Sequence, residues 1–213
     1  ARRPGSVSQM AANGRFVPYI DSRGGQAATL RPRDMIPGGY GSYRFVAETG
    51  TMAAGLAADA EIFELRFDPA DTNMRMQLRR LWMSAASLGT GFTAGQVIVE
   101  AKVARGFTVA GTGGGAITLT TNQAKLRTAY GTSLAEGRIS ATATLTAGTQ
   151  TLDTLGFGGA QSVCTNAAYT QFLGVGGSSV VLYETVPGEE ALVLTGDEGI
   201  VIRITVPAPG TWA

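Results

Sequence analysis

The feature that most constrains the fold is a period-two alternation of apolar and polar residues, which recurs along the chain between turn-forming residues. In residues 61–67 three apolar side chains fall on one face, and Asp68-Pro69 ends the run. Residues 96–106 repeat the pattern. The side chains expected on the buried faces are Phe63, Leu65 and Phe67, and then Val97, Val99, Ala101 and Val103. Because successive side chains of a strand point to opposite faces, both segments are predicted to be half-buried β-strands.

Several further segments show strand patterns separated by glycine-rich turns. They are residues 116–121, 138–146, 180–186, 191–194 and 200–206. We expect residues 116–121 to pair with residues 96–106 across the loop at 111–115, since a flexible glycine-rich connection suits a hairpin. By the same argument, residues 191–194 are expected to form a hairpin with residues 200–206. Strands this frequent, with no alternating helices, predict antiparallel sheets.

Two segments are ambiguous at this level. Residues 74–87 fit either a helix or a strand whose face shifts at Arg79-Arg80, and we favour the strand with a bulge because its neighbours are strands. Residues 122–130 are expected to form one short helix with Asn122 as its cap. A hydrophobic content of 44% with 15% charged residues is typical of an ordered β protein. The predicted fold is all-β, an antiparallel, jelly-roll-like β-sandwich with an extended N-terminal arm.

The first 44 residues differ from the remainder in charge. They carry seven arginines against two acids, whereas residues 45–213 carry ten basic and fourteen acidic side chains. The formal charges of the two parts are therefore +5 and −4, within a total of +1. A segment with dispersed prolines and no apolar periodicity cannot bury enough surface to fold by itself. We expect a basic arm at residues 1–44, ordered by contact with a partner, and a β-sandwich domain at residues 45–213.

Arginines and aromatic residues are interleaved along the arm, and both types are enriched in protein interfaces. The residues expected to contact a partner are Arg2, Arg3, Arg15, Phe16, Tyr19, Arg23, Arg31, Arg33 and Tyr40. Two alternatives stay open: the arm packs on its own domain, or it binds nucleic acid by neutralising phosphates. Its arginines are spread out and it contains no lysine, so docking on an acidic protein surface is the favoured interpretation.

The histidine and cysteine content excludes several classes of enzyme. The chain contains no histidine, which removes Ser-His-Asp and Cys-His catalysis and zinc sites with imidazole ligands. Cys164 is the single cysteine, so it forms no internal disulfide, and we expect it to be a small buried hydrophobe. We expect a protein that is not an enzyme and that binds no cofactor and no metal.

Two motifs have both a chemical and a structural interpretation. The loop at 111–115 has the glycines of a phosphate cradle but not the Gly-Lys-Ser/Thr ending, so a hairpin or surface loop is favoured. The acids Glu189-Glu190 and Asp197-Glu198 would suit calcium or a glycosidase-like carboxylate pair if they converged. Solvated loops are the favoured interpretation for both acidic pairs.

A group of arginines accompanies Trp82, and its members are Arg75, Arg79 and Arg80. Charge and stacking would suit nucleic acid, but we favour a sheet face that meets an acidic neighbouring subunit, because the domain itself is acidic. The chain has no apolar run of about 18 residues for a membrane span and no apolar core of a signal peptide at its start. We therefore expect a soluble protein, made in the cytoplasm, without a membrane partner.

Several short segments carry a resemblance to known proteins. They are residues 41–44, 61–67, 91–96, 116–128, 145–153 and 191–203. In this order they resemble a group of tailed-bacteriophage proteins that are encoded close to the major capsid protein. The resemblance covers about residues 41–213 and leaves the arm unmatched. It implies a β-rich virion component, and it carries no catalytic signature and assigns no functional residue.

The resemblance and the arm together predict a non-enzymatic virion structural protein, a capsid decoration or cement protein on the capsid surface. Its expected partner is the major capsid protein, bound by a homo-oligomer, a trimer or a dimer, because a repeating lattice favours symmetric binders. A protein that binds only the assembled shell stabilises it by mass action. A tail or head-to-tail connector protein and a receptor- or glycan-binding virion module are the alternatives. Nucleic acid is not the expected partner.

Overall fold

The computed structural model divides the chain into two compact units, residues 1–40 and residues 41–213, and each is described by itself. It describes the backbone of residues 19–20, 26–27, 53, 172 and 211–212, and residues 41–52, 56, 58–69, 74–89, 92–119, 124–167, 169, 171, 173–174, 179–186 and 190–207 in full. In the first unit, β1 (Tyr19–Ile20) pairs with β2 (Gln26–Ala27) in antiparallel fashion. The second unit is called the body.

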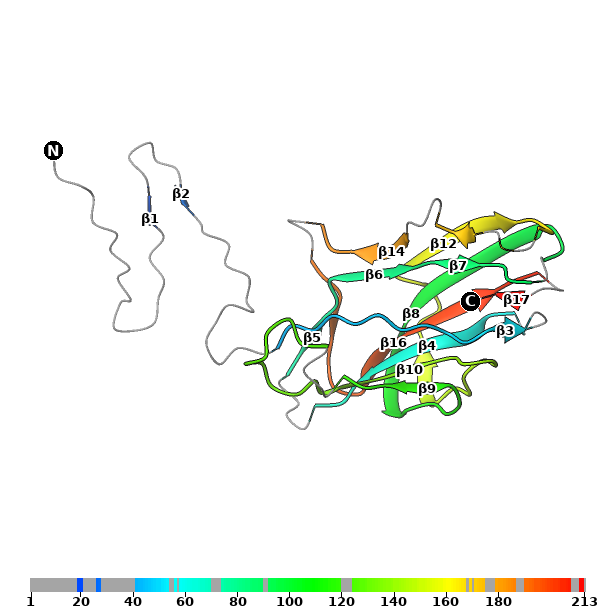
Figure 1. Cartoon of the computed structure of the whole chain (residues 1–213). Coiled ribbons are helices and arrows are strands. Elements are labelled where there is room, and N and C mark those ends of the chain that lie inside the picture. The colour runs from blue at the N-terminus through cyan, green and yellow to red at the C-terminus, as the bar shows by residue number, and fades with distance from the viewer. Residues whose placement is uncertain are drawn as a thin grey trace. The chain divides into compact units, whose positions relative to one another are not determined.

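The body contains a seven-stranded antiparallel sheet, the main sheet (Figure 1). Its strands are β4 (Ala60–Phe67), β8 (Gly95–Val109), β9 (Gly115–Ile117), β10 (Ala135–Ile139), β11 (Thr149–Leu152), β12 (Gly158–Cys164) and β16 (Glu198–Thr205). Their order is β11, β8, β16, β4, β10, β9. The long strand β8 also pairs with β12 through its first half, and with β11 through its second half. β8, β16 and β4 form the centre of the sheet.

Four short strand pairs form the second layer of the body. They are β3 (Met52–Ala53) with β17 (Thr211–Trp212), β5 (Met76–Gln77) with β15 (Val193–Leu194), β6 (Arg80–Met83) with β14 (Val180–Glu184), and β7 (Ala85–Ala86) with β13 (Gln171–Leu173). All four pairs are antiparallel. Each pair contributes one or two buried side chains to the same core as the main sheet.

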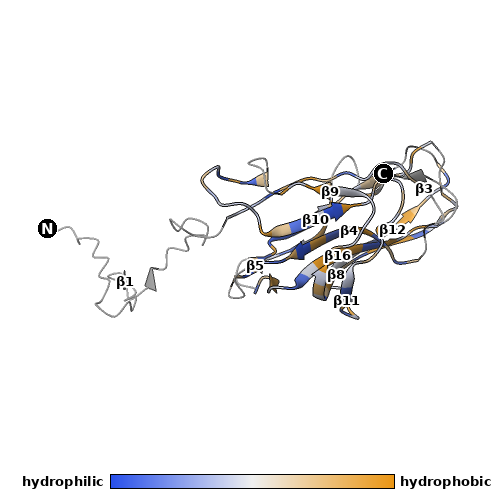
Figure 2. Cartoon of the chain, turned by 90° about the horizontal axis from the view of Figure 1, so that it is seen from below, coloured by the Kyte–Doolittle hydropathy of each residue, from blue (hydrophilic) through white to orange (hydrophobic). Residues whose placement is uncertain are grey.

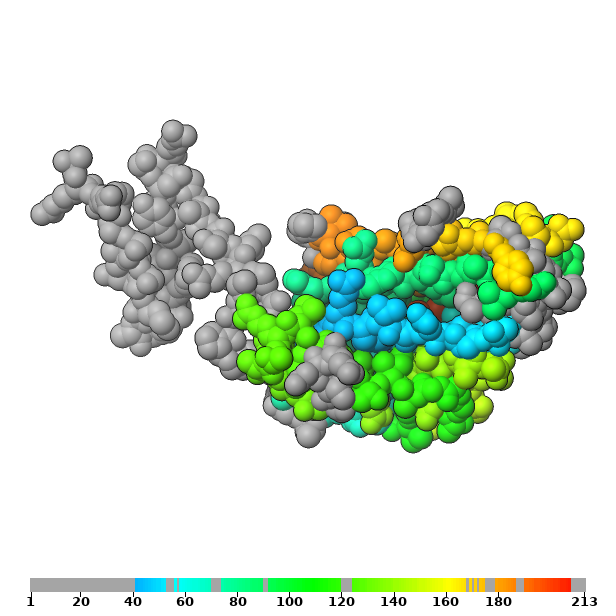
Figure 3. All heavy atoms as spheres, in the orientation of Figure 1, coloured from blue at the N-terminus to red at the C-terminus, as the bar shows by residue number. Residues whose placement is uncertain are grey.

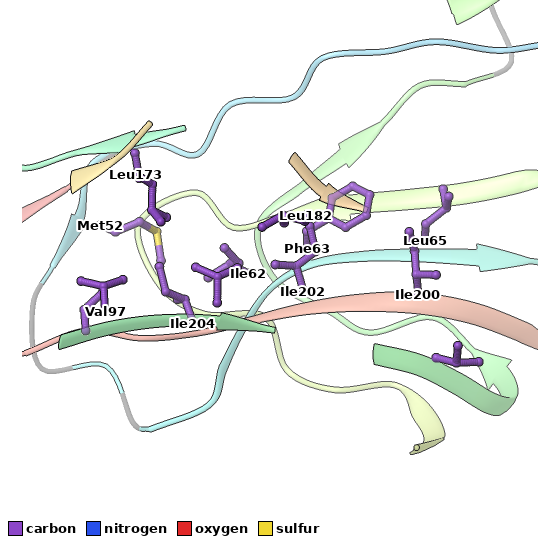
Figure 4. Close-up of a cluster of buried hydrophobic side chains, with 14 of the residues drawn as sticks. Met52, Ile62, Phe63, Leu65, Val97, Leu173, Leu182, Ile200, Ile202 and Ile204 are labelled. Atoms are coloured by element: carbon purple, nitrogen blue, oxygen red, sulfur yellow. The ribbon is translucent and has the colours of Figure 1, made fainter. Parts of the chain in front are cut away.

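The core lies between the two layers (Figure 4). Ile200, Ile202 and Ile204 alternate along β16 toward it, beside Phe63 and Leu65 of β4. From the opposite side, the second layer contributes Met52, Leu173, Leu182 and Leu194. Apolar side chains on one face of each layer thus bury one another, which confirms the predicted antiparallel β-sandwich.

Period-two alternation predicted the buried faces of the main strands well. The side chains expected on the core face of β8 are all at most 5% exposed, and those expected in β4 at most 6%. Residues 74–87 are extended, as favoured, and are divided into β5, β6 and β7. The expected strand at residues 180–186 is β14, which ends at Glu184. These agreements follow from the apolar residues on the core face of each strand, which keep a two-residue period although some positions of the outer face are buried as well.

The expected strand pairings were wrong. The segment that follows the glycine-rich loop, β9, pairs with β10 and not with β8. The segment before the last strand, β15, pairs with β5 in the other layer and not with β16. The turn between β15 and β16 does close, because the Glu198 amide donates to the Thr195 carbonyl, but it connects the two layers. Alternation specifies which face is buried and says nothing about the partner strand.

Two further expectations were corrected. The strand expected at residues 138–146 is β10, which ends at Ile139, and the chain then bends. Ala124 has 3₁₀-helical geometry, but residues 125–130 are not helical: Lys125 forms an isolated bridge with Tyr43, and the Tyr130 amide donates to the Arg127 carbonyl in a turn. The proposed cap of that helix, Asn122, lies outside the described residues. Long-range pairing of residue 125 overrides the local helical preference.

The outer face of the main sheet, on the side away from the core, is also organised. Figure 2 views the body from this side, where hydrophilic and hydrophobic positions alternate along β4, β10 and β16. A small second cluster of Ala104, Phe107 and Val201, all fully buried, lies on this face with Leu152 packed against it. The charged side chains of the main sheet surround this cluster.

Candidate partner-binding surface

The predicted contact residues of the arm lie outside the residues whose side chains the structure describes. They are Arg2, Arg3, Arg15, Phe16, Tyr19, Arg23, Arg31, Arg33 and Tyr40, and of these the backbone of Tyr19 alone is described, in β1. Their role in binding stays a prediction. The candidate surface is therefore built from the part of the body that follows them in the chain.

The body begins with a short segment that is tied to a distant loop. The Arg44 amide donates to the Ala124 carbonyl at 2.7 Å, and the Leu126 amide donates to the Ser42 carbonyl at 2.9 Å. The Tyr43 hydroxyl donates to the Gly131 carbonyl at 2.8 Å, and partial burial raises the pKa of this hydroxyl. Residues 41–44, which the sequence assigned to the arm, thus belong to the compact unit that starts at Gly41.

The side chain of Arg44 reaches from this segment to Trp82 of β6. Its guanidinium lies 5.3 Å from the centre of the Trp82 ring, and the guanidinium of Arg80 lies 5.8 Å from the same ring. Such contacts contribute roughly 0.5–1 kcal/mol each at exposed sites. Arg80 also approaches Glu184 at 3.7 Å, with both side chains about half exposed, so that ion pair adds at most about 1 kcal/mol.

We call the surface around this contact the junction patch. It consists of Arg44, Arg79, Arg80, Trp82, Lys125 and Arg127. Its segments meet at one end of the body, where the spheres of residues 41–46, 79–82 and 124–131 adjoin in Figure 3. Arg127 lies 6.0 Å from the ring of Tyr130, and the backbone of Arg79 accepts a hydrogen bond from the Thr185 amide. The guanidinium groups of Arg44 and Arg80 lie over one ring, and the adjoining segments carry three further basic residues, Arg79, Lys125 and Arg127, within a unit whose own charge is −3.

Of the three arginines that the sequence grouped with Trp82, the structure brings Arg80 onto the ring, while Arg79 is exposed and precedes β6. Arg75 is exposed and donates to its own neighbour, the Met74 carbonyl. Arg44 was missed, although residues 43–49 alternate between partly buried and exposed positions with Arg44 outward. Alternation over this segment was the signal that could have identified it, but its docking partner at 124–126 is distant in sequence.

The acidic side chains of the outer face are mostly paired. Arg66 contacts Asp68 at 2.8 Å and Glu136 at 3.0 Å. On the same face Arg203 pairs with Asp59 and Lys102 with Glu100. Arg105 binds Asp153 and Glu198 at the end of β8, on the side of Val103 and Ile200, and its guanidinium lowers the pKa of Asp153 through their hydrogen bond. Several charged side chains of the outer face are thus paired within the chain.

The remaining candidate chemistry is structural. Cys164 is buried, and its thiol points at the Thr93 and Gly95 carbonyls. Burial raises the pKa of this thiol, so the reactive thiolate is disfavoured, in agreement with the expected small hydrophobe. In the loop at 111–115, Thr112 bridges to Thr146, and this supports the loop interpretation.

The acidic pairs near the end of the chain do not form a described metal site. Glu198 is bound to Arg105 and accepts a hydrogen bond from the Thr195 amide, while Asp197 is exposed. Glu189 lies outside the described residues. Across the described ranges, no group of three or more His, Cys, Asp or Glu side chains is placed to hold a metal ion. Within the same ranges, no helix has the length and apolar character needed to cross a membrane.

No family model, no curated protein and no solved structure matches this chain. Its own residues, chiefly those of the junction patch, are therefore the basis for assigning a function.

Proposed function

We propose that this protein is a non-enzymatic structural component of a tailed-bacteriophage virion, a decoration protein that binds the acidic outer surface of the assembled shell. The observation that carries the proposal is the junction patch. It combines two guanidinium groups over the Trp82 ring with three further basic residues of the adjoining segments, on a body whose formal charge is −3. The virion context comes from the resemblance of residues 41–213 to phage proteins.

The chemistry of the patch favours a protein partner over nucleic acid. The Trp82 ring is engaged by two guanidinium groups, and so is less available as a stacking platform for bases. Glu184 lies within the same surface and would repel phosphates. Arginine with tryptophan is instead the combination enriched at the centres of protein interfaces, where guanidinium forks pair with carboxylates. The proposed partner is the major capsid protein.

The proposed mechanism is stabilisation by mass action. A protein that binds the assembled shell, and not its dissociated subunits, shifts the equilibrium toward the shell by RT ln(1 + [L]/Kd). Binding as a homo-oligomer, a trimer or a dimer, would present several arms and patches to neighbouring lattice points, which raises the avidity without new contacts.

The test is co-sedimentation of the full-length protein with purified shells at several salt concentrations. Arg44→Gln with Arg80→Gln is expected to weaken binding by about tenfold or more, because each removed charge contact is worth about 1 kcal/mol. Replacing the six arginines of residues 1–40 by glutamine should weaken it further. Arg105→Gln with Arg203→Gln is the control, since it changes the net charge equally at positions away from the junction patch.

The proposal fails if the control and patch variants bind shells equally well, or if the wild-type protein does not bind them. Electron microscopy of labelled virions distinguishes the alternatives. Labels distributed over the shell lattice support decoration, whereas labels at one vertex or along the tail would indicate a connector or tail protein.

A further inference from the structure

A β-bulge in β4 places two glutamates on the same side of the main sheet. In the register with β16, Phe63 pairs with Ile202 and Glu61 pairs with Arg203, which leaves Ile62 as the extra residue. Residues three apart in a regular strand face opposite sides, but the extra residue reverses this relation. Glu61 and Glu64 therefore both lie on the outer face, and Ile62 turns into the core.

Glu64 is buried without an ion-pair partner among the described residues. The residue is 1% exposed. Neither carboxylate oxygen has a hydrogen-bond partner of ordinary geometry among the described residues. Burial raises the pKa of Glu64, the neighbouring Glu61 raises it further, and the facing Gly111 amide offsets part of the effect. Such a group demands an explanation, since an uncompensated buried charge is strongly unfavourable.

The nearby arginines are engaged elsewhere. Arg138, opposite Glu64 in the register, donates to the Gly113 carbonyl at 2.7 Å. Arg66 is held by Asp68 and Glu136. The side chain of Arg203, opposite Glu61, is directed to Asp59. None of these guanidinium groups forms an ion pair with Glu64, although two of them are close enough to lower its pKa.

Further oxygens lie around the two glutamates. Gln150 donates from Nε2 to Glu61 Oε2 at 3.2 Å, and its own Oε1 is buried without a hydrogen-bond partner. A Cβ atom built on Gly111 would lie 2.7 and 3.1 Å from the two Glu64 oxygens and would also meet the Thr146 carbonyl oxygen. The carboxylate and this carbonyl therefore face one point beside a residue that has no side chain.

We propose that Glu64 and Glu61, with Gln150 Oε1 and the Thr146 carbonyl, form a site for a hard divalent cation of the calcium class. Carboxylate, amide and carbonyl oxygens are the donors that Ca²⁺ prefers, and its irregular coordination tolerates a donor set drawn from two strands and a loop. Mg²⁺ requires near-octahedral geometry and retains its water, so it binds more weakly. Two carboxylates place the affinity in the weak range, with a Kd of about 10⁻⁴–10⁻³ M.

The experiment uses the full-length protein, first dialysed against EDTA and then titrated with CaCl₂. Calorimetry is expected to give one site per chain. At 10 mM Ca²⁺ the Tm should rise by about 3–8 °C, because the ligand binds only the folded chain. MgCl₂ should give a smaller rise. Glu64→Gln and Gln150→Leu should each remove the response to Ca²⁺, while Glu136→Gln, an exposed carboxylate of the same face, should keep it.

Glu64→Gln also reports its own folding, because it is expected to be more stable than the wild type in EDTA, where no buried carboxylate needs neutralisation. Two results would overturn the site. One is a wild-type protein that shows neither binding heat nor a Tm shift. The other is an equal Ca²⁺ response in the wild type and in Glu64→Gln. If Arg138→Gln destabilises the protein in EDTA and the wild type shows no response to Ca²⁺, then Arg138 is the group that neutralises Glu64, and the cation site is overturned. Shell binding is a separate readout, so the decoration proposal does not depend on this result.

Discussion

The outer face of the main sheet and the junction patch are both rich in charged side chains, but the partners of those side chains differ. On the outer face several arginines and lysines pair with acids, and the face also contains the buried cluster of Phe107 and Val201. In the junction patch two guanidinium groups lie over one half-buried tryptophan, and Glu184 is the one acid seen to pair there among the described residues. Paired charges beside a packed cluster serve the stability of the chain, whereas exposed guanidinium groups over an aromatic side chain are available to a partner.

The largest expected difference between the two regions is in packing. Phe107→Ala removes a fully buried ring from the outer face and is expected to cost about 3–5 kcal/mol of unfolding free energy. Trp82→Ala removes a half-buried ring from the junction patch, so we expect a loss of about 1–2 kcal/mol. Urea denaturation of both variants measures this contrast. Equal losses would show that the junction patch is part of the core rather than a binding surface.

Removing an arginine should separate the regions by a smaller amount. Arg66 is 11% exposed and donates to the Thr108 carbonyl as well as to Asp68 and Glu136, so Arg66→Ala is expected to cost about 2 kcal/mol. Arg80→Ala should cost less than about 1 kcal/mol, because its side chain is half exposed. Thermal unfolding of the two variants compares them directly. A larger loss for Arg80→Ala than for Arg66→Ala would contradict the division of roles.

The smallest expected effect is the pH dependence that Glu64 gives to the free energy of unfolding. Burial raises the pKa of Glu64 in the folded chain, so the folded state holds its proton at pH values where the unfolded chain has lost it. Stability in EDTA is thus fully present below the unfolded pKa, near 4.5, and falls as pH rises through the folded pKa. The slope cannot exceed about 1.4 kcal/mol per pH unit for one proton.

Glu64→Gln should flatten this decline, measured as Tm against pH between 5 and 7.5 in EDTA. Glu61, whose pKa is also raised by its partial burial, contributes a residual slope of the same sign that the variant keeps. An unchanged pH profile in Glu64→Gln would mean that the carboxylate is neutralised in the folded chain without a proton.

Much of the fold followed from local pattern, and the pairing did not. The core faces of β4 and β8 were predicted because their core-facing positions are apolar at a two-residue period. β9 and β15 were given the wrong partners, because a glycine-rich turn permits a hairpin without requiring one. The bulge at Ile62 was not recognised either. An extra apolar residue near the start of a strand leaves the alternation of the residues that follow it unchanged.

The candidate surface was predicted in part. Trp82 and Arg80 were grouped because they are neighbours in one segment, and the grouping survives in β6. Arg44 could not be added, because its place on the same ring depends on backbone hydrogen bonds to residues some 80 positions away. The buried oxygens around Glu64 depend on Gln150 and Gly111 in the same way.

By itself the sequence determined the β class of the body, the buried faces of its main strands, and the division between a basic leading segment and an acidic remainder. These are properties of composition and short-range period, which tertiary context does not alter. The tertiary structure alone decided which strands pair, where Arg44 and Glu64 lie, and which charges are satisfied within the chain. Those outcomes depend on contacts between residues far apart in sequence, whose mutual geometry no local pattern records.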